Sequence, residues 1–486
     1  MRARLSVYLR TDDLADGASI DIKLVWPGSC RVAQVMGGEV VGQLLELAIA
    51  LNAGQHTDPD DGPLAVSEIC ARQATRAVAI WGHGMTAGTG DMFDFDRVID
   101  RRGTHASKWD NMAKLSGISA PDAIPMWVAD MDFAAPPGVT EALMAMAERG
   151  VYGYYADTGS WAAALAEWMR RRHKLEVDPA WVTPTPGVVS GLGLILQATS
   201  APDDEVVVFP PAYHAFRRII VANGRRILDS PLVESNGRYA MDLDALRAKL
   251  TPRTKVVFFC SPHNPGGTVW SPEEIRELAH FCAEHDLLLV SDEIHCDLVF
   301  AGAKHTPTLT AAPEIADRLI TTVAATKTFN VAGAHVGACF TANAALKRAI
   351  DARVMASGLG SYNSFGMTAT EAAWRTGEAW LDALMPYLTA SRDLFDRRIE
   401  AAAPGARSMR LDATYLAWVD FSGTGLASDE VAARVKNRAR IFASPGPQFG
   451  PGGDCWLRFN FATSRLVLEE ALGRLDEAFS DLRAGR

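Results

Sequence analysis

Three side chains that could take part in one reaction follow three apolar stretches of the chain. Each stretch is typical of a buried strand. Asn264 comes after 255–260, Asp292 directly follows 287–291, and Lys327 follows 319–324. Ligands of open α/β sheets bind at the carboxyl ends of the strands, so we expect the amide, the carboxylate and the amine to meet there. The Thr, Asn and Gly residues after Lys327 predict a loop rather than a helix at that point.

These groups match the needs of pyridoxal phosphate. The cofactor requires a lysine amine for a Schiff base, an acid beside its pyridine nitrogen and a donor to its 3′-oxygen. Each residue also has an ordinary interpretation. Lys327 is then a surface lysine, Asp292 a helix N-cap and Asn264 a turn residue.

Seven short motifs resemble one enzyme superfamily in their residues and in their order. The motifs are Phe93-Asp94-Phe95 with 100–104, Trp127–Phe133, Tyr152–Tyr154, Pro211–Tyr213, the turn at Asn264, Asp292–His295 with Lys327, and Arg458. From about Met92 to its end, the chain resembles the fold-type I pyridoxal-phosphate enzymes of the aminotransferase class I/II superfamily. Within that group it is most similar to the MalY/PatB-type cystathionine β-lyases.

The resemblance implies further contacts to the cofactor. It implies that Lys327 binds the cofactor and moves the α-proton of the substrate. His295 would reach the 3′-oxygen or serve only the structure, and Tyr213 would stack on the ring or be a core aromatic. The phosphate contacts would come from Val188 and Val189 at a helix start, from the Thr326 hydroxyl, and from Tyr154 of a second copy in a homodimer.

The same resemblance implies that Arg458, Asn264 and Asp130 bind an amino-acid substrate. A guanidinium can form hydrogen bonds to both oxygens of a carboxylate at once, although an isolated arginine is more often solvated or ion-paired. The chain departs from many aminotransferases at two positions. Ala324 stands where they have serine, and His335 where they have arginine. The arginine's absence at position 335 disfavours an activity like that of aspartate aminotransferases.

Strand-like and helix-like segments alternate through the middle of the chain. The predicted strands are 181–184, 205–209, 225–228, 255–260, 287–291, 319–324 and 336–341. The predicted helices are 187–199, 213–223, 242–250 and 271–285, the last beginning with a Ser-Pro-Glu-Glu cap. This alternation predicts an α/β fold. The resemblance implies fold type I, with a mostly parallel seven-stranded sheet between helices and a smaller α/β domain.

The predicted division of the chain has four parts, of which residues 1–91 are the first. Residues 92–140 form an N-terminal arm with part of the small domain, 141–376 the large cofactor-binding domain, and 377–486 the small domain. Other expected helices are 140–149 capped by Thr140, 160–174 capped by Ser160, 344–355, 364–376, 378–402 and 467–483, and other expected strands are 416–421 and 455–460.

Residues 1–91 lie outside the resemblance. They contain a candidate amphipathic helix at Val40–Leu51 and a glycine-rich run at Gly82–Gly90, which lacks the Gly-Lys-Ser/Thr ending of a phosphate loop. Our hypothesis is that Met92 is the native start and that 1–91 is a mis-assigned or poorly ordered extension. The intact mass of the natively expressed protein tests it.

Composition narrows the class of protein. The net charge of −10 disfavours nucleic acid and anionic membranes as partners, and we see neither a membrane span nor a secretory signal. The seven cysteines have no CxxC spacing, so we expect reduced thiols in the cytoplasm and no metal site.

Three functions are consistent with the sequence. The first is a carbon–sulfur β-lyase that converts L-cystathionine or another L-cysteine S-conjugate to a thiol, pyruvate and ammonia. The second is an aminotransferase that uses the same residues. The third is a regulatory binding protein without enzymatic activity. The first is preferred because of the resemblance of 127–133 and 292–295.

Overall fold

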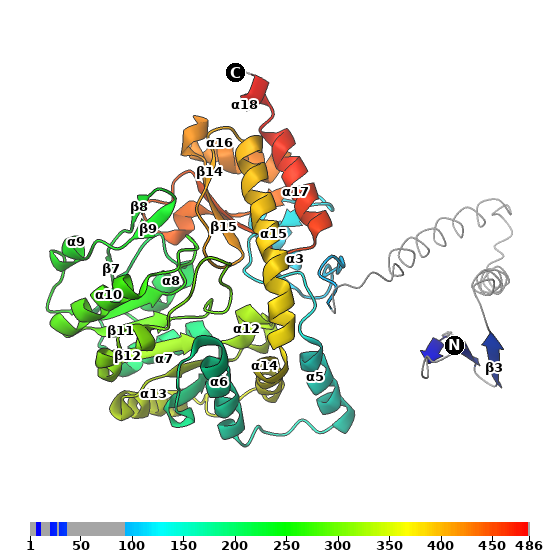
Figure 1. The fold of residues 1–486 in the computed structure, drawn as a ribbon, viewed down its shortest axis with the longest axis horizontal. Coiled ribbons are helices and arrows are strands. Elements are labelled where there is room, and N and C mark those ends of the chain that lie inside the picture. The colour runs from blue at the N-terminus through cyan, green and yellow to red at the C-terminus, as the bar shows by residue number, and fades with distance from the viewer. Residues whose placement is uncertain (1–5, 11–19, 27–28, 36–92, 485–486) are drawn as a thin grey trace. The chain divides into compact units, whose positions relative to one another are not determined.

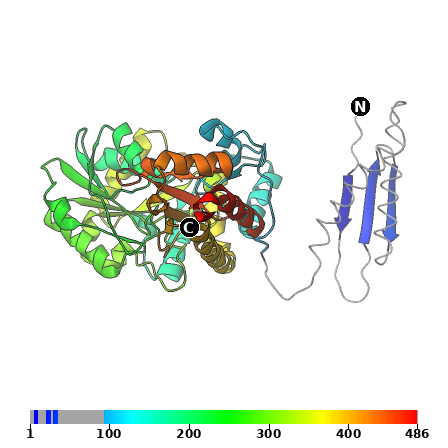
Figure 2. The ribbon, with the colours of Figure 1, turned by 90° about the horizontal axis from the view of Figure 1, so that it is seen from above.

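The computed structural model describes residues 6–10, 20–26, 29–35 and 93–484, and the chain divides into two compact units, Met1–Gly90 and Asp91–Arg486. In the first unit, three strands form an antiparallel sheet in the order β1-β2-β3 (Figure 2). They are β1 (Ser6–Arg10), β2 (Ile20–Trp26) and β3 (Ser29–Val35). The sequence interpretation contained no strands there. The helix predicted at Val40–Leu51 and the glycine-rich run at Gly82–Gly90 lie outside the described residues.

The second unit is built on a seven-stranded sheet with the order β5-β13-β12-β11-β10-β6-β7 (Figure 1). Its strands are β5 (Val182–Thr185), β6 (Glu205–Val208), β7 (Arg226–Asp229), β10 (Thr254–Cys260), β11 (Leu288–Asp292), β12 (Leu319–Val323) and β13 (Gly337–Phe340). β13 runs antiparallel to both of its neighbours, and the other pairs are parallel. The predicted mostly parallel sheet is therefore confirmed.

Both faces of this sheet are covered by helices, because alternate residues of its central strands are apolar on opposite faces. In β10, Val256 and Phe258 pack with α7 (Val188–Thr199), α8 (His214–Ala222) and α13 (Ala344–Ala356). Val257 and Phe259 pack on the other face. The elements there are α9 (Leu243–Arg247), α10 (Pro272–Glu284) and α11 (Thr308–Ala311).

The helix starts follow local capping chemistry. Helix α10 begins with the predicted capping box, in which Ser271 and Glu274 each bind the other's backbone N–H. Two predicted starts were wrong. Helix α5 (Pro137–Arg149) begins with a proline in its first turn rather than at Thr140, and α6 (Thr158–His173) is capped by Asp157, which accepts from Gly159 N–H, rather than by Ser160.

The smaller part of the unit combines both ends of the second unit's chain. Its four-stranded sheet has the order β14-β15-β18-β17, with β14 (Arg407–Ser408), β15 (Leu416–Asp420), β17 (Ser444–Pro445) and β18 (Trp456–Asn460). Helix α15 (Glu378–Ala402) lies beside α17 (Arg465–Ala478) (Figure 1). Strand β4 (Ile124–Pro125), from the N-terminal arm, pairs in parallel with β16 (Ile441–Phe442).

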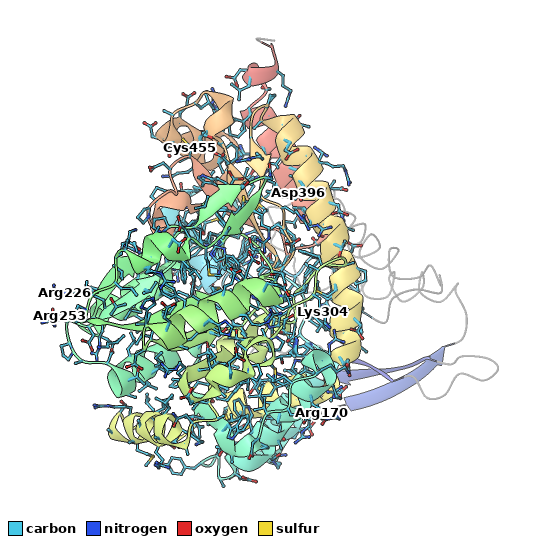
Figure 3. The ribbon with its side chains drawn as sticks, turned by 60° about the vertical axis from the view of Figure 1, so that its left-hand side comes forward. Arg170, Arg226, Arg253, Lys304, Asp396 and Cys455 are labelled. Atoms are coloured by element: carbon cyan, nitrogen blue, oxygen red, sulfur yellow. The ribbon has the colours of Figure 1, made fainter. Side chains whose placement is uncertain are left out.

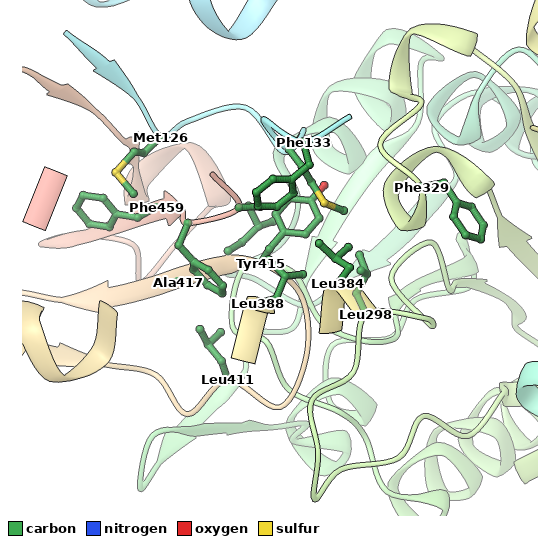
Figure 4. Close-up of a cluster of buried hydrophobic side chains, with 14 of the residues drawn as sticks. Met126, Phe133, Leu298, Phe329, Leu384, Leu388, Leu411, Tyr415, Ala417 and Phe459 are labelled. Atoms are coloured by element: carbon green, nitrogen blue, oxygen red, sulfur yellow. The ribbon is translucent and has the colours of Figure 1, made fainter. Parts of the chain in front are cut away.

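The remaining elements of the second unit connect or extend these layers. They are α3 (Ser107–Asp110), α4 (Met112–Ser116), β8 (Val233–Ser235), β9 (Arg238–Ala240), α12 (Ala325–Thr328), α14 (Ser364–Thr376), α16 (Ser428–Ala433) and α18 (Asp481–Ala484). One apolar cluster joins the arm to α15, β15 and β18, and Figure 4 shows part of it, including Phe133, Leu384 and Tyr415. Arg170, Arg226, Arg253 and Lys304 are exposed at the periphery (Figure 3). Within the described residues, the helices are too short or too polar to cross a bilayer.

Candidate active site

The predicted amide, acid and amine do lie at one edge of the large sheet. Asp292 is the last residue of β11 and is in register with Cys260, the last residue of β10, which Asn264 follows by four residues. Lys327 follows the end of β12 by four residues. It lies in the single-turn helix α12, closed by Phe329 N–H donating to Ala325 O at 3.0 Å, so the loop predicted after Lys327 begins only after Thr328, with turns at Phe329 and Asn330.

The amine of Lys327 is largely enclosed. Its Nζ donates to the carbonyl oxygen of Ala129 at 2.6 Å. Burial lowers the pKa of Lys327 to about 8, and the charge of Arg458 acts in the same direction, whereas Asp130 and Asp292 oppose it. A sizeable fraction of the amine is therefore uncharged near neutral pH, as a nucleophile or a base must be.

The carboxylate of Asp292 is buried without a cationic hydrogen-bond donor. The Thr322 hydroxyl donates to its Oδ1 at 3.1 Å and the Ile294 N–H at 3.3 Å. Burial raises the pKa of Asp292 to about 7, although both hydrogen bonds lower it. The acid is thus placed where a cationic ligand group would stabilise its charge.

The guanidinium of Arg458, on β18, is buried and has neutral partners. It donates to Asn264 Oδ1 at 3.0 Å through Nη1 and to Trp127 O at 2.8 Å through Nη2, with Ser444 Oγ at 3.4 Å. Among the described residues its Nε has no hydrogen-bond partner. Burial lowers the pKa of Arg458 to about 10. A buried cation with an unused donor is suited to an anionic ligand.

Two rings adjoin these charged groups. His295 is buried, its Nδ1 has no partner within the described chain, and burial lowers its pKa to about 3, helped by the charges of Lys327 and Arg458. Tyr213 is the N-cap residue of α8. Burial raises the pKa of Tyr213, while the charge of Arg458 lowers it.

The start of α7 supplies free backbone donors. Val188 and Val189 are its first residues, and Gly187 precedes them with a left-handed φ of 83° and no side-chain cap. A Cβ atom on Gly337 of β13 would come within 2.9 Å of Val188 N, so glycine permits this close approach. Thr326, beside Lys327, is buried. The helix start can therefore bind an anion.

The side chains of two predicted site residues form no hydrogen bond with this group in the described part of the chain. Tyr154 is 92% exposed and so does not reach the site of its own chain. The carboxylate of Asp130 pairs with Arg101 at 2.8 Å, and Lys108 lies 3.9 Å from it. Asp130 therefore influences Lys327 through its charge.

Comparison with known proteins decides the family. The model of the family "Aminotransferase class I and II" matches residues 122–475. The chain belongs to this family. Over 388 residues it is 39% identical to cystathionine β-lyase PatB of Bacillus subtilis (strain 168), with 80% of this chain and 100% of the relative covered. It is 31% identical over 395 residues to protein MalY of Escherichia coli (strain K12), with 81% and 100% covered.

Solved structures of similar fold support the membership in the aminotransferase family. Cystalysin from Treponema denticola, which contains pyridoxal 5′-phosphate, superimposes with a TM-score of 0.78 at 30% identity and covers 81% of this chain and 100% of its own. The PLP-bound C–S lyase from Staphylococcus hominis has a TM-score of 0.74 at 30% identity and the same two coverages.

Sequence reasoning missed Tyr415 and the carbonyl groups of the 127–133 segment. The Tyr415 hydroxyl donates to Ala129 O at 3.0 Å, and burial strongly raises its pKa. Asn460 Nδ2 donates to Val128 O and to Asp130 O, both at 2.6 Å. Carbonyl groups are present at every residue, so their role has no signal in the sequence. The position of Tyr415 at the start of a buried strand was the one available signal.

Proposed function

We infer that this protein is a pyridoxal-phosphate-dependent carbon–sulfur β-lyase. It splits L-cysteine S-conjugates, such as L-cystathionine, into a thiol, pyruvate and ammonia. The inference is supported by 39% identity to cystathionine β-lyase PatB and by the fold of the C–S lyase from Staphylococcus hominis. In both comparisons the alignment spans the whole length of the relative.

The observation that carries the cofactor assignment is the unpaired acid at Asp292. Its donors, Thr322 and Ile294, are neutral, and burial holds its pKa near 7. A protonated pyridine nitrogen would supply the missing positive charge. Lys327 and Asn264 lie at the same sheet edge, and the residues present therefore fit pyridoxal phosphate.

When bound, pyridoxal phosphate supplies an electron sink that acidifies the α-carbon of an amino acid. Lys327 would hold the cofactor through Nζ, and the same amine would accept the α-proton of the substrate. Its lowered pKa leaves the amine able to accept that proton near neutral pH. Asp292 would keep the pyridine nitrogen charged, and Asn264 and His295 are proposed to bind the 3′-oxygen.

Arg458 is proposed to bind the α-carboxylate of the substrate. It lies beside Asn264 with an unpaired Nε, and the planar guanidinium can hold both oxygens in one orientation. Tyr213 is proposed to stack on the cofactor ring. The backbone N–H groups of Val188 and Val189 and the hydroxyl of Thr326 are proposed to bind the phosphate.

We also propose a homodimer. Tyr154 is exposed next to Val151 (77%) and Tyr152 (57%), and the Tyr152 ring lies 5.4 Å from that of Phe365, which is 42% exposed. Such an apolar group is typical of a contact surface. In a dimer, Tyr154 would reach the phosphate of the partner's site.

We further propose that the protein works in the reducing cytoplasm, because the thiols of Cys260, Cys282, Cys296 and Cys339 are buried and free.

An aminotransferase is the alternative, since the chain is also 30% identical to arginine–pyruvate transaminase AruH of Pseudomonas aeruginosa. One assay separates the two functions. Purified enzyme loaded with pyridoxal phosphate receives L-cystathionine without any keto acid. A lyase releases pyruvate and free thiol continuously. Absence of both products, together with amino-group transfer once a keto acid is added, would overturn the lyase proposal.

A further inference from the structure

A second buried acid lies behind the turn that carries Asp292 and His295. Asp297 follows His295 by two residues, and its side chain is only 4% exposed. Its Oδ1 lies 2.7 Å from His173 Nε2 and 3.1 Å from Trp168 Nε1, both from helix α6. Its Oδ2 accepts from the Thr328 hydroxyl at 2.7 Å. Three donors from two helices therefore converge on one carboxylate.

This carboxylate is charged in the folded protein. Burial alone would raise the pKa of Asp297, but hydrogen bonds from His173, Thr328 and Trp168 hold it below its usual value. Hydrogen bonds to an ionised acceptor are shorter and stronger than neutral ones.

A metal site is the alternative use of this cluster, since one ligand atom from each of His173, Cys296 and Asp297 lies within 4.8 Å of the others. Both Asp297 oxygens already accept hydrogen bonds, which favours a structural anchor.

The anchor is attached directly to the lysine. Thr328 is the residue after Lys327, and both belong to the four-residue helix α12, which has no side-chain cap at its start. A single helical turn is unstable on its own, so neighbouring contacts must fix its position. Besides Asp297, the edge-to-face contact of Phe329 with Trp168, at 5.2 Å between centroids, joins this turn to α6.

We propose that Asp297, held by His173, is a positioning residue for Lys327 and acts through the hydroxyl of Thr328. The hydrogen bond fixes α12 against the turn that bears Asp292 and His295. It thereby sets where the amine lies relative to that acid. The positioning role depends on the proposed function in one respect, because that function gives Lys327 its reaction. Asp297 itself contacts neither the amine nor Asp292 in the described hydrogen-bond network.

The test removes one hydroxyl and leaves the carboxylate buried with its other donors. Thr328→Val is nearly isosteric, and Thr328→Ser keeps the hydroxyl. Thr183→Val is the matched control. Thr183 lies on the edge strand β5, is buried, and likewise donates its hydroxyl to a carboxylate, that of Asp351, at 2.6 Å. The measurements are the thermal midpoint, kcat and KM for L-cystathionine, and the pH dependence of cofactor capture by the cofactor-free enzyme, which reports the pKa of Lys327.

We expect Thr328→Val to lower kcat by about 10- to 100-fold, because a misplaced catalytic group is that costly, with a smaller change in KM. The pH midpoint of cofactor capture should shift as well. Thr328→Ser should restore both values, and Thr183→Val should change only the thermal midpoint. The proposal is overturned if Thr328→Val matches Thr183→Val in kcat and capture midpoint, or if a folded Thr328→Ser variant recovers neither. If the lyase proposal is wrong, the wild-type enzyme will release no pyruvate from L-cystathionine. The pH dependence of cofactor capture will still report the position and pKa of Lys327 in that case.

Discussion

Lys327 and Tyr415 donate hydrogen bonds to the same carbonyl oxygen, that of Ala129, at 2.6 and 3.0 Å. The carbonyl lies in segment 127–133, the amine in α12 after the seven-stranded sheet's strand β12, and the hydroxyl just before β15 of the four-stranded sheet. One oxygen atom thus joins three parts of the fold at the reactive amine.

Tyr415→Phe should raise the pKa of Lys327 in the cofactor-free enzyme by less than about one unit. Without the competing hydroxyl, the Ala129 carbonyl can bind the charged ammonium more strongly, which favours the protonated form. The pH profile of cofactor capture measures this shift. A shift to lower pH would contradict the shared-acceptor interpretation.

Lys327→Ala should abolish the visible absorption band of the lysine-bound cofactor. It should also lower pyruvate release from L-cystathionine by at least about 1000-fold, since the variant lacks the amine proposed to hold the cofactor and to act as the base. An absorption scan and a pyruvate assay check both outcomes. Lys304→Ala, at an exposed surface lysine, is the control. Persistence of the band in the Lys327 variant would refute the assignment.

Arg458→Ala should leave the cofactor band intact and reduce kcat/KM by at least about 100-fold, because two hydrogen bonds to a substrate carboxylate are lost. Arg458→Lys should recover only part of this loss, since an ammonium keeps the charge but lacks the planar fork. Steady-state kinetics distinguish the variants. An unchanged KM and kcat in the alanine variant would remove Arg458 from the substrate site.

Asp292 should make the stability of the cofactor-free protein depend on pH. Its pKa is about 7 when folded and close to the ordinary value of 3.8 when unfolded, so between these values the folded state binds more protons. The free energy of unfolding should therefore fall as pH rises from about 4 to about 7, by a few kcal/mol at most. Urea unfolding of wild type and Asp292→Asn measures it. The asparagine variant should lack this decline and be the more stable protein above pH 7.

Mixed subunits can test whether Tyr154 acts across a dimer. Lys327→Ala and Tyr154→Ala chains are unfolded together and refolded. If Tyr154 serves the partner's site, each mixed dimer contains one intact site, and activity should return to roughly a quarter of the wild-type value. No recovery, with dimers confirmed by light scattering, would place Tyr154 outside the partner's site.

Much of the large sheet could be predicted because its strands are continuous apolar runs. β10, β11 and β12 lie within a residue of their expected bounds, and α15 matches residues 378–402. The capping box of α10 was equally clear. These features depend on neighbours in sequence, which pattern analysis can see.

The errors have two causes: distant contacts at α12 and at the acceptor of Lys327, and an ambiguous local cap at α6. The short helix α12 was not predicted, because Asp297, whose carboxylate binds the Thr328 hydroxyl, lies 31 positions away. The acceptor of Lys327 is 198 positions away and the partner of Tyr415 is 286 away. At α6, two nearby residues, Asp157 and Ser160, could have served as the cap, and local sequence did not distinguish them.

Strand β13 runs antiparallel to both of its neighbours, β5 and β12, so it begins at the edge of the sheet where they end, and its first residue, Gly337, borders the start of α7. An added methyl group there would collide with the backbone of Val188 and Gly187, at 2.9 and 3.0 Å. The backbone of Gly337 therefore packs directly against the backbone at the start of α7, and a side chain at this position would force the two segments apart. Attempts to redesign substrate preference should leave Gly337 untouched.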